Sequence, residues 1–467
     1  MLNIRRIALL SVFAITASLA HAQTLAATPP MGWNSWDAYG LTIDEADFKA
    51  NVTVLAGIKQ YGWQYAVIDE GWYMEDPFGG KVEKEKYIFD DYGRLIPALN
   101  RFPDAANGAG LKPLADWVHA QGLKFGIHLV RGIPRRDVEV NSPIAGSQFK
   151  AADAGDTSDA CPWDEGNWGV KDNAAGQAWY DSMIGLYAGW GVDYLKVDCI
   201  SNRPYKGSEI RQIAAAIKKT GRPIVLSLSP GPTNLSHAAE VGKYSQMWRI
   251  SDDHWDVWHD THKDPGGSGE FPFGTYDAFD RLAAWQPYVK PGNWPDEDML
   301  PFGSLTPHPG WGQPRESRLT EDETRTEFTL WAITRSPLIL GANLTKMSPF
   351  LRGLVTNKEL LNTNQKAERS YPIAHLPAAF DGVRAWRADI WGIDTVPSTI
   401  GLFNTGDTPV SLHFRWSQLG VDGKHVFALD IFSGSKSSEA DEVSVTLPAH
   451  GSTAYYVSQS YKSHKPR

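Results

Sequence analysis

Apolar, β-rich segments that end in polar residues alternate with helix-like segments through residues 31–343. The predicted helices, whose apolar residues are spaced three to four apart, include Leu111–Gln121, Ala178–Trp190 and Ser208–Thr220. The predicted strands are Met31–Trp36, Tyr65–Glu70, Lys124–Val130, Tyr194–Asp198, Ile224–Ser229, Met247–Ser251, Tyr288–Trp294 and Leu338–Asn343. Eight strands joined by helical crossovers indicate an α/β fold, a (β/α)8 barrel.

A doubly wound open sheet is the alternative for this alternation. However, its glycine-rich dinucleotide fingerprint does not follow the first predicted strand. The Gly-Gly-Ser-Gly run at 266–269 follows Asp264-Pro265 and is typical of a loop. The pattern therefore favours the barrel.

The pattern changes after about Tyr371, where short alternating segments are separated by turn residues. The predicted strands are Val383–Trp386, Ser398–Phe403, Val410–Arg415, His425–Ile431, Glu442–Leu447 and Ser452–Val457. This spacing predicts an antiparallel β-sandwich over residues 371–467, after a catalytic barrel over residues 23–370. The sandwich either binds carbohydrate or caps the barrel, and we favour the structural role.

The first 22 residues are typical of a signal peptide. Arg5 and Arg6 precede an apolar stretch, Ile7–Leu19, which is too short to span a membrane. The small residues around His21 give a cleavage site near Ala22. No second long apolar run follows, so we expect a periplasmic or secreted protein without a membrane span. In that setting Cys161 and Cys199 are expected to form a disulfide, the alternative being two buried thiols.

Composition narrows the class of ligand. The net charge is −9 and no basic run stands out, which argues against a nucleic acid partner. Many of the 19 Trp residues lie beside Gly, Asn, Asp or Pro, as in the segments 32–36 and 292–296. Trp in such polar, turn-like contexts suits a cleft that stacks on flat, hydroxylated ligands.

Charged residues interrupt or end the predicted strands. Lys196 and Asp198 lie two positions apart on one strand and so share a face. Taken alone, they are equally consistent with a structural ion pair. The other strand-end groups are Asp69 and Glu70, Arg249 with Asp252 and Asp253, and Asp296 and Asp298. In a barrel these groups meet at one mouth, and such carboxylates suit glycosidic cleavage, whereas unrelated helix caps and surface ion pairs explain only one or two of them.

Six segments carry a resemblance to glycoside hydrolase family 27, which contains α-galactosidases and α-N-acetylgalactosaminidases. They are Pro30–Trp36, Tyr65–Trp72, Tyr194–Asp198, Trp248–Asp253, Trp294–Leu300 and Leu330–Leu338, in the family's order and across most of residues 28–365. The resemblance implies a (β/α)8 barrel followed by an antiparallel β domain. This agrees with the pattern-based interpretation.

The resemblance also implies roles for individual residues. Asp198 matches the nucleophile, and Asp253 matches the acid/base of an Arg-x-x-x-Asp motif that begins at Arg249, with Asp252 as its rival. Asp69, Lys196, Trp36, Arg249 and Asp298 match or adjoin sugar-binding positions, and Cys161 and Cys199 match a disulfide beside the site. The implied mechanism is double displacement with retention, with carboxyl groups about 5–5.5 Å apart and no metal or cofactor.

Three positions depart from the α-galactosidase pattern. Glu70 stands where these enzymes have Asp, which crowds the C6 hydroxymethyl of galactose and resembles β-L-arabinopyranosidases. Ser229 replaces a Glu that reads the 2-hydroxyl, which makes N-acetylgalactosamine a further candidate, and His128 replaces a Tyr and either lines the pocket or is a loop histidine. An exo-acting α-galactosidase leads these alternatives, and a non-catalytic carbohydrate-binding protein ranks lowest. A metal site at His254, His259 and His262 is not favoured.

Overall fold

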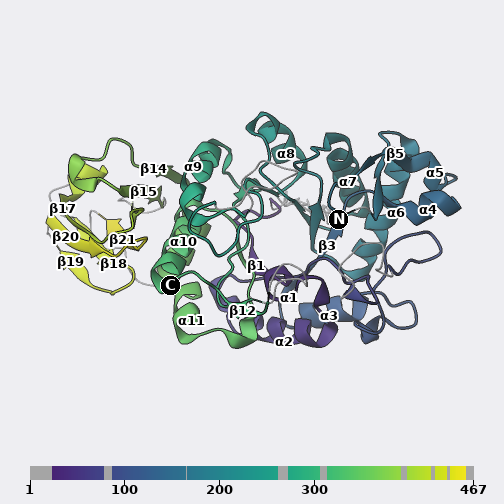
Figure 1. The fold of residues 1–467 in the computed structure, drawn as a ribbon, viewed down its shortest axis with the longest axis horizontal. Helices are drawn as coiled ribbons and strands as arrows, with labels where there is room; N and C mark the ends of the chain where they lie inside the picture. The colour runs from purple at the N-terminus through teal and green to yellow at the C-terminus, as the bar shows by residue number, and fades with distance from the viewer. Residues whose placement is uncertain are drawn as a thin grey trace, which may run out of the picture.

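The computed structural model describes residues 24–77, 87–164, 166–260, 272–305, 313–390, 397–421, 426–438 and 442–458. The expected signal peptide at 1–22, His262, the glycine run at 266–269 and His425 lie outside these ranges. The chain forms a large α/β unit followed by a smaller all-β unit, which runs from green to yellow at the left of Figure 1. Within the described ranges, no helix is long and apolar enough to cross a membrane.

The large unit is built on eight parallel strands in the order β10-β9-β8-β7-β3-β2-β1-β13. The strands are β1 (Met31–Asn34), β2 (Tyr65–Ile68), β3 (Lys124–Val130), β7 (Tyr194–Asp198), β8 (Val225–Leu228), β9 (Met247–Arg249), β10 (Trp294–Asp296) and β13 (Leu338–Leu340). The sheet curls until a bridge between Leu300 and Leu340 links its two edges. The predicted (β/α)8 barrel is confirmed, and its strands are almost wholly buried, as expected for a parallel sheet covered by helices.

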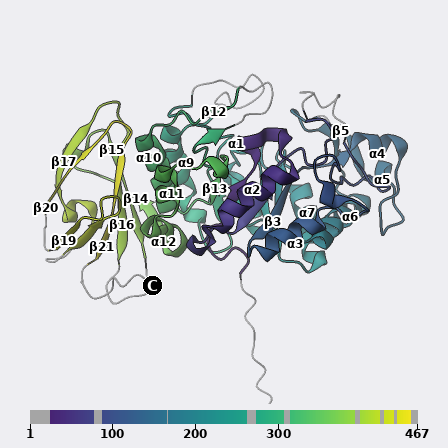
Figure 2. The same cartoon turned by 90° about the horizontal axis from the view of Figure 1, so that it is seen from below.

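Helices surround the strands on the outside of the barrel (Figures 1 and 2). They are α2 (Glu45–Ala56), α3 (Lys112–Ala120), α6 (Ala174–Trp190), α7 (Gly207–Thr220), α8 (Ala238–Tyr244), α9 (Thr275–Trp285), α10 (Glu321–Thr334), α11 (Pro349–Val355) and α12 (Lys358–Lys366). The three predicted helices are confirmed. Helix α6 begins earlier than predicted because the Asn173 side chain caps it, and it ends at Gly191, whose φ is 94°.

The seventh barrel strand was placed wrongly by the sequence pattern. The predicted strand covered Tyr288–Trp294, whereas β10 begins at Trp294 and ends at Asp296. Residues 286–288 form a 3₁₀ turn, and Lys290 and Asn293 then pair across a turn in which Gly292 has a φ of 81°. Pro287 and the Pro291-Gly292 pair break the apolar run, so the strand starts after them.

A small antiparallel sheet is inserted between β3 and α6. It contains β4 (Ile133–Pro134), β5 (Gly155–Ala160) and β6 (Asn167–Val170), with the short helices α4 (Arg135–Val140) and α5 (Ala151–Ala154) beside it. The polar sequence of this segment gave no periodic signal. The insertion matters because β5 leads directly to Cys161.

The all-β unit contains a six-stranded antiparallel sheet, β14-β15-β16-β21-β18-β19, and a two-stranded sheet, β17-β20. The strands are β14 (Arg369–Pro372), β15 (Val383–Asp389), β16 (Ser398–Asn404), β17 (Val410–Arg415), β18 (Phe427–Asp430), β19 (Lys436–Ser438), β20 (Glu442–Leu447) and β21 (Ser452–Ser458). The predicted β-sandwich is confirmed, whereas β14 and β19 were not predicted. Helix α10 packs against β15, β16 and β21 and so joins the two units (Figures 1 and 2).

Candidate active site

Aspartates end or follow three barrel strands, β2, β7 and β9, and turn the chain there. The Oδ1 atoms of Asp69 and Asp198 each accept the next backbone N–H, at 2.9 and 2.5 Å. Asp252 does the same for Asp253, at 2.9 Å. Such side-chain bonds to nearby backbone favour turns over continued strand. The same residues that stop the strands therefore bring carboxylates to one end of the barrel.

Asp69 lies buried at the bottom of this site. Its Oδ2 accepts hydrogen bonds from Lys196 Nζ at 2.8 Å and from Asn34 Nδ2 at 2.6 Å. Asp69 and Lys196 are 2% and 9% exposed, so neither charge is free in solvent. Burial opposes ionisation of Asp69, but Lys196, His128 and the Glu70 N–H together outweigh burial and hold the pKa of Asp69 below its usual range. The result is a fixed ion pair that can bind sugar hydroxyls.

Asp198, the predicted nucleophile, is held by groups other than Lys196. Its Oδ2 lies 3.3 Å from His128 Nε2, and its Oδ1 accepts the Cys199 N–H. Burial raises the pKa of Asp198, but His128, then Lys196 and the Cys199 N–H, outweigh burial and lower it. The side chain remains 20% exposed. Asp198 is therefore an ionised carboxylate with one oxygen fixed and part of its side chain exposed.

His128 lies within the barrel on β3, in register with Lys196 on β7. It is fully buried, and its Nε2 is 4.0 Å from Asp69 Oδ1 as well as close to Asp198. The loop alternative is wrong, because His128 lies within a strand, whereas its role as a pocket residue stays a prediction.

Arg249 joins two carboxyl groups on the opposite side of the site. Its Nη2 lies 3.2 Å from Asp253 Oδ1 and 2.7 Å from Asp298 Oδ2. Burial raises the pKa of Asp298 to about 7 against the effect of Arg249, with Asp253 and Asp296 adding to the rise. Asp298 is 3% exposed and Asp253 is 31% exposed, so only Asp253 presents its carboxyl to the open site.

Asp252, the alternative acid/base, is already paired with another side chain. Its side chain is 4% exposed and forms an ion pair with Arg203. Burial, with a contribution from the Asp253 charge, raises the pKa of Asp252 to about 6. The geometry therefore favours Asp253 as the group that can reach a ligand.

The other predicted site residues lie at the same ends of their strands. Trp36 begins a short helix after β1, and its backbone N–H donates to Asn34 Oδ1 at 2.8 Å. Glu70 directly follows Asp69 and is partly exposed. Ser229 is 2% exposed, and its N–H donates to Val197 O at 2.9 Å, which places it beside β7.

Two buried acids near the site were not found from the sequence. Asp37 is 1% exposed and packs against Gly341, where a Cβ would collide with its Oδ2. Burial, with a contribution from Asp298, raises the pKa of Asp37 well above its usual range. Glu327 lies on α10 with its Oε2 3.1 Å from His254 Nε2, and neither side chain is exposed. Asp37 directly follows the Pro30–Trp36 segment, and Glu327 lies on a mostly polar helix. Neither position therefore stands out in the sequence as a buried acid.

His254 and His259 both contact aromatic rings in the structure, and His254 also pairs with Glu327. The ring of His254 contacts Trp331, and that of His259 contacts Tyr276, with centroids 5.0 and 4.5 Å apart. Within the described part of the chain, no three His, Cys, Asp or Glu side chains gather so that they could hold a metal ion.

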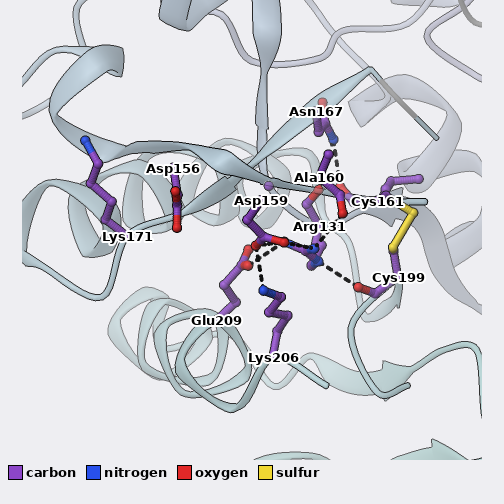
Figure 3. A network of polar contacts seen from close by, with 12 residues as sticks. Arg131, Asp156, Asp159, Ala160, Cys161, Asn167, Lys171, Cys199, Lys206 and Glu209 are labelled. Carbon is purple, nitrogen blue, oxygen red and sulfur yellow. Dashed lines mark hydrogen bonds and ion pairs between the residues drawn. A yellow bond between two sulfur atoms is a disulfide. The ribbon is translucent and has the colours of Figure 1, made fainter. Parts of the chain in front are cut away.

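The expected disulfide joins Cys161 to Cys199 (Figure 3), and Cys199 directly follows Asp198 in the sequence. It closes a loop with a sequence separation of 38 residues. A loop of that length predicts a stabilisation of about 4 kcal/mol from restriction of the unfolded chain. We expect the Cys161→Ala/Cys199→Ala variant to unfold several degrees below the wild type in thermal scans without reductant. Equal unfolding temperatures would show that the bridge adds no stability.

The site as a whole contains one ionised carboxylate, Asp198 on β7, and an accessible second carboxyl, Asp253 after β9. The fixed ion pair Asp69–Lys196 and the arginine Arg249 belong to the same end of the barrel. Cleavage of a glycosidic bond with retention requires such a pair of carboxyl groups.

Comparison with known proteins agrees with this chemistry. Residues 164–366 match the Melibiase_2 family, described as alpha galactosidase A. A GH27 β-L-arabinopyranosidase structure from Geobacillus stearothermophilus is 36% identical, with a TM-score of 0.84, and covers 94% of this chain and 98% of its own. A putative α-N-acetylgalactosaminidase structure from Bacillus halodurans is also 36% identical, with a TM-score of 0.78 and coverages of 92% and 97%. α-Galactosidase A of Cellvibrio japonicus is 28% identical over 94% of this chain and 93% of that protein.

Proposed function

The chain belongs to glycoside hydrolase family 27, and on this basis we propose that it is a retaining exo-glycosidase that prefers terminal β-L-arabinopyranosides. Its glycoside hydrolase class follows from the family, whereas the sugar is our inference. The sequence pattern alone places α-galactosidase first, and the 36% identity to the GH27 β-L-arabinopyranosidase structure supports the reversed order. The observation in this chain that carries the inference is Glu70, which directly follows Asp69 of the Asp69–Lys196 pair. The longer carboxylate narrows the space that the C6 hydroxymethyl of galactose would need, and L-arabinopyranose lacks that group.

The mechanism uses two carboxyl groups in two steps. Asp198 attacks the anomeric carbon as the bond to the leaving oxygen breaks, and Asp253 gives its proton to that oxygen. Asp253, now ionised, then takes a proton from water, whose oxygen attacks the anomeric carbon and releases Asp198 as a carboxylate. His128 and the Cys199 N–H support the first step because they favour the ionised form of Asp198.

The neighbouring acids suit a neutral, hydroxylated ligand. Asp69 is ionised and can accept hydrogen bonds, whereas Asp298, with a pKa raised to about 7, is partly protonated near neutral pH. Partial protonation of Asp298 lessens the charge repulsion among the carboxyl groups of the site.

An α-galactosidase is the second candidate, supported by the 28% identity to the Cellvibrio japonicus enzyme. An α-N-acetylgalactosaminidase is the third, because Ser229 leaves room beside the 2-position and the Bacillus halodurans structure is similar. Aryl glycosides of the three sugars, assayed side by side, separate these candidates. We expect the highest kcat/KM on the β-L-arabinopyranoside. A higher value on either of the other substrates would contradict the preferred sugar.

Shortening Glu70 tests the residue that carries the proposal. In Glu70→Asp we expect the ratio of kcat/KM on α-galactoside to that on β-L-arabinopyranoside to rise by roughly 10-fold or more, because one methylene less opens space for C6. Ser229→Ala serves as the control, since it alters the pocket near the 2-position and leaves this ratio unchanged. An unchanged ratio in Glu70→Asp would remove Glu70 as the determinant.

We also propose that the protein is exported, as the N-terminal pattern predicts. The Cys161–Cys199 disulfide supports this, because such bridges persist in oxidising compartments. Fractionation of the native host, with activity in the periplasm or medium, tests the proposal. Activity confined to the cytoplasm would contradict it.

A further inference from the structure

Arg131 is a buried arginine that immediately follows β3 and contacts Cys199 (Figure 3). It is only 1% exposed. Its backbone N–H donates to Asp198 O at 3.1 Å, and its side-chain Nε donates to Cys199 O at 2.7 Å. A single residue therefore holds the carbonyl groups of two consecutive residues, the first of which is the proposed nucleophile.

The turn that Arg131 holds has an unfavourable backbone conformation. Cys199 has a φ of 59°, in the left-handed region that residues with a Cβ rarely adopt. In this conformation its N–H points at Asp198 Oδ1, 2.5 Å away, while Oδ2 stays 3.3 Å from His128. Such a conformation persists only when its surroundings impose it. The orientation of the Asp198 carboxylate therefore depends on the contacts that hold the Cys199 backbone in this conformation.

The guanidinium of Arg131 is anchored by two carboxylates. Its Nη1 and Nη2 bind Asp159 at 2.9 and 3.0 Å, and Nη1 also binds Glu209 at 2.7 Å. Lys206 Nζ binds Asp159 at 2.7 Å, and the Tyr180 hydroxyl donates to Glu209. A bidentate arginine–carboxylate pair fixes the plane of the guanidinium as well as its charge. Helix α7 and strand β5, which carry Glu209 and Asp159, are therefore connected to the turn through Arg131.

The disulfide is a third restraint on the turn at Cys199. Cys161 follows β5 and is joined to Cys199, and Ala160 O lies 3.4 Å from Arg131 Nη2 (Figure 3). A buried ion network of this size is not explained by stability alone, since well-packed apolar residues often serve as well. All of these contacts converge on the residue that follows Asp198.

We propose that Arg131 is a positioning residue for the nucleophile: its guanidinium fixes the left-handed turn at Cys199 and thereby directs the Asp198 carboxylate at the anomeric carbon. This inference rests on the proposed role of Asp198. It assigns Arg131 no contact with the substrate.

Arg131→Lys keeps the positive charge but loses the planar guanidinium group and the Nε–H that donates to Cys199 O. We expect kcat/KM to fall on the order of 100-fold with KM little changed, because a small misplacement of the nucleophile slows the chemical step. Arg222→Lys is the matched control. Arg222 binds Val192 O and Gly191 O at 2.7 and 2.9 Å, at the opposite end of β7, so we expect its loss to leave kcat/KM unchanged.

The pH profile separates positioning from a general loss of structure. The His128 contact and the Cys199 N–H lower the pKa of Asp198. If the turn loosens, that pKa rises, so the acid limb of kcat/KM moves to higher pH in Arg131→Lys but not in Arg222→Lys. Wild-type kcat/KM and an unshifted acid limb in folded Arg131→Lys would overturn the inference, as would an equal kinetic loss in Arg222→Lys.

Asp159→Asn provides a second variant if Arg131→Lys does not fold. It weakens the anchor and leaves Arg131 in place, so we expect a roughly tenfold fall in kcat/KM with the same shift of the acid limb. Unchanged kinetics in Asp159→Asn would then overturn the inference. Full activity in Asp198→Asn would instead contradict the proposed function, so the two failures are distinguishable.

Discussion

Asp198→Asn should lower kcat/KM by roughly 10⁴- to 10⁶-fold on every substrate that the wild type hydrolyses, as expected for loss of a covalent nucleophile. The amide has the shape of the carboxylate but carries no charge to form the glycosyl–enzyme bond. The measurement is steady-state hydrolysis of aryl glycosides, with thermal unfolding recorded on the same samples.

Asp193→Asn is a suitable control for this variant. Asp193 precedes the same strand, at its opposite end, where it accepts the Phe125 N–H at 3.0 Å and pairs with Arg222 at 2.6 Å. We expect Asp193→Asn to lower stability and to keep kcat/KM within a few fold. Near wild-type turnover by folded Asp198→Asn would exclude this residue as the nucleophile.

Asp253→Asn should show a loss that depends on the leaving group. General acid catalysis contributes roughly 10²- to 10⁴-fold, so we expect a fall in that range for natural glycosides or alkyl glycosides, whose leaving oxygens need a proton. Aryl glycosides with acidic phenols need little protonation, and their first step should be much less affected.

Asp252→Asn tests the choice between the adjacent aspartates. Asp252 is held by Arg203 and is almost fully buried, so we expect this variant to keep the leaving-group dependence of the wild type. If Asp252→Asn rather than Asp253→Asn lost activity on poor leaving groups, the assignment of the acid/base would have to be reversed.

The strand ends could be predicted from the sequence because charged residues in buried apolar runs are conspicuous. Asp69, Lys196, Asp198 and Arg249 were all found in this way, and the barrel brings them together as expected. Which of them touch was not predictable. Lys196 pairs directly with Asp69, and Asp198 contacts His128, because these contacts depend on sheet register and barrel curvature.

Other features of the fold and the site could not be predicted from the sequence. The start of β10 depends on the turn at Pro291–Gly292, which an apolar run conceals. Asp37 was hidden because a carboxyl in the first turn of a helix usually faces solvent, whereas here the fold buries it against Gly341. Arg131 was hidden because its partners, Asp159 and Glu209, are distant in sequence and come from an unpredicted strand and from the outer helix α7.

Trapping of the glycosyl–enzyme intermediate is the most direct test of the account. A fluorinated glycosyl fluoride of the preferred sugar, which slows release of the intermediate, should add the mass of one fluorosugar to the protein. Peptide mapping should place that mass on Asp198. A label on another carboxylate, or steady hydrolysis with inversion of the anomeric configuration and no label, would contradict the proposed double displacement.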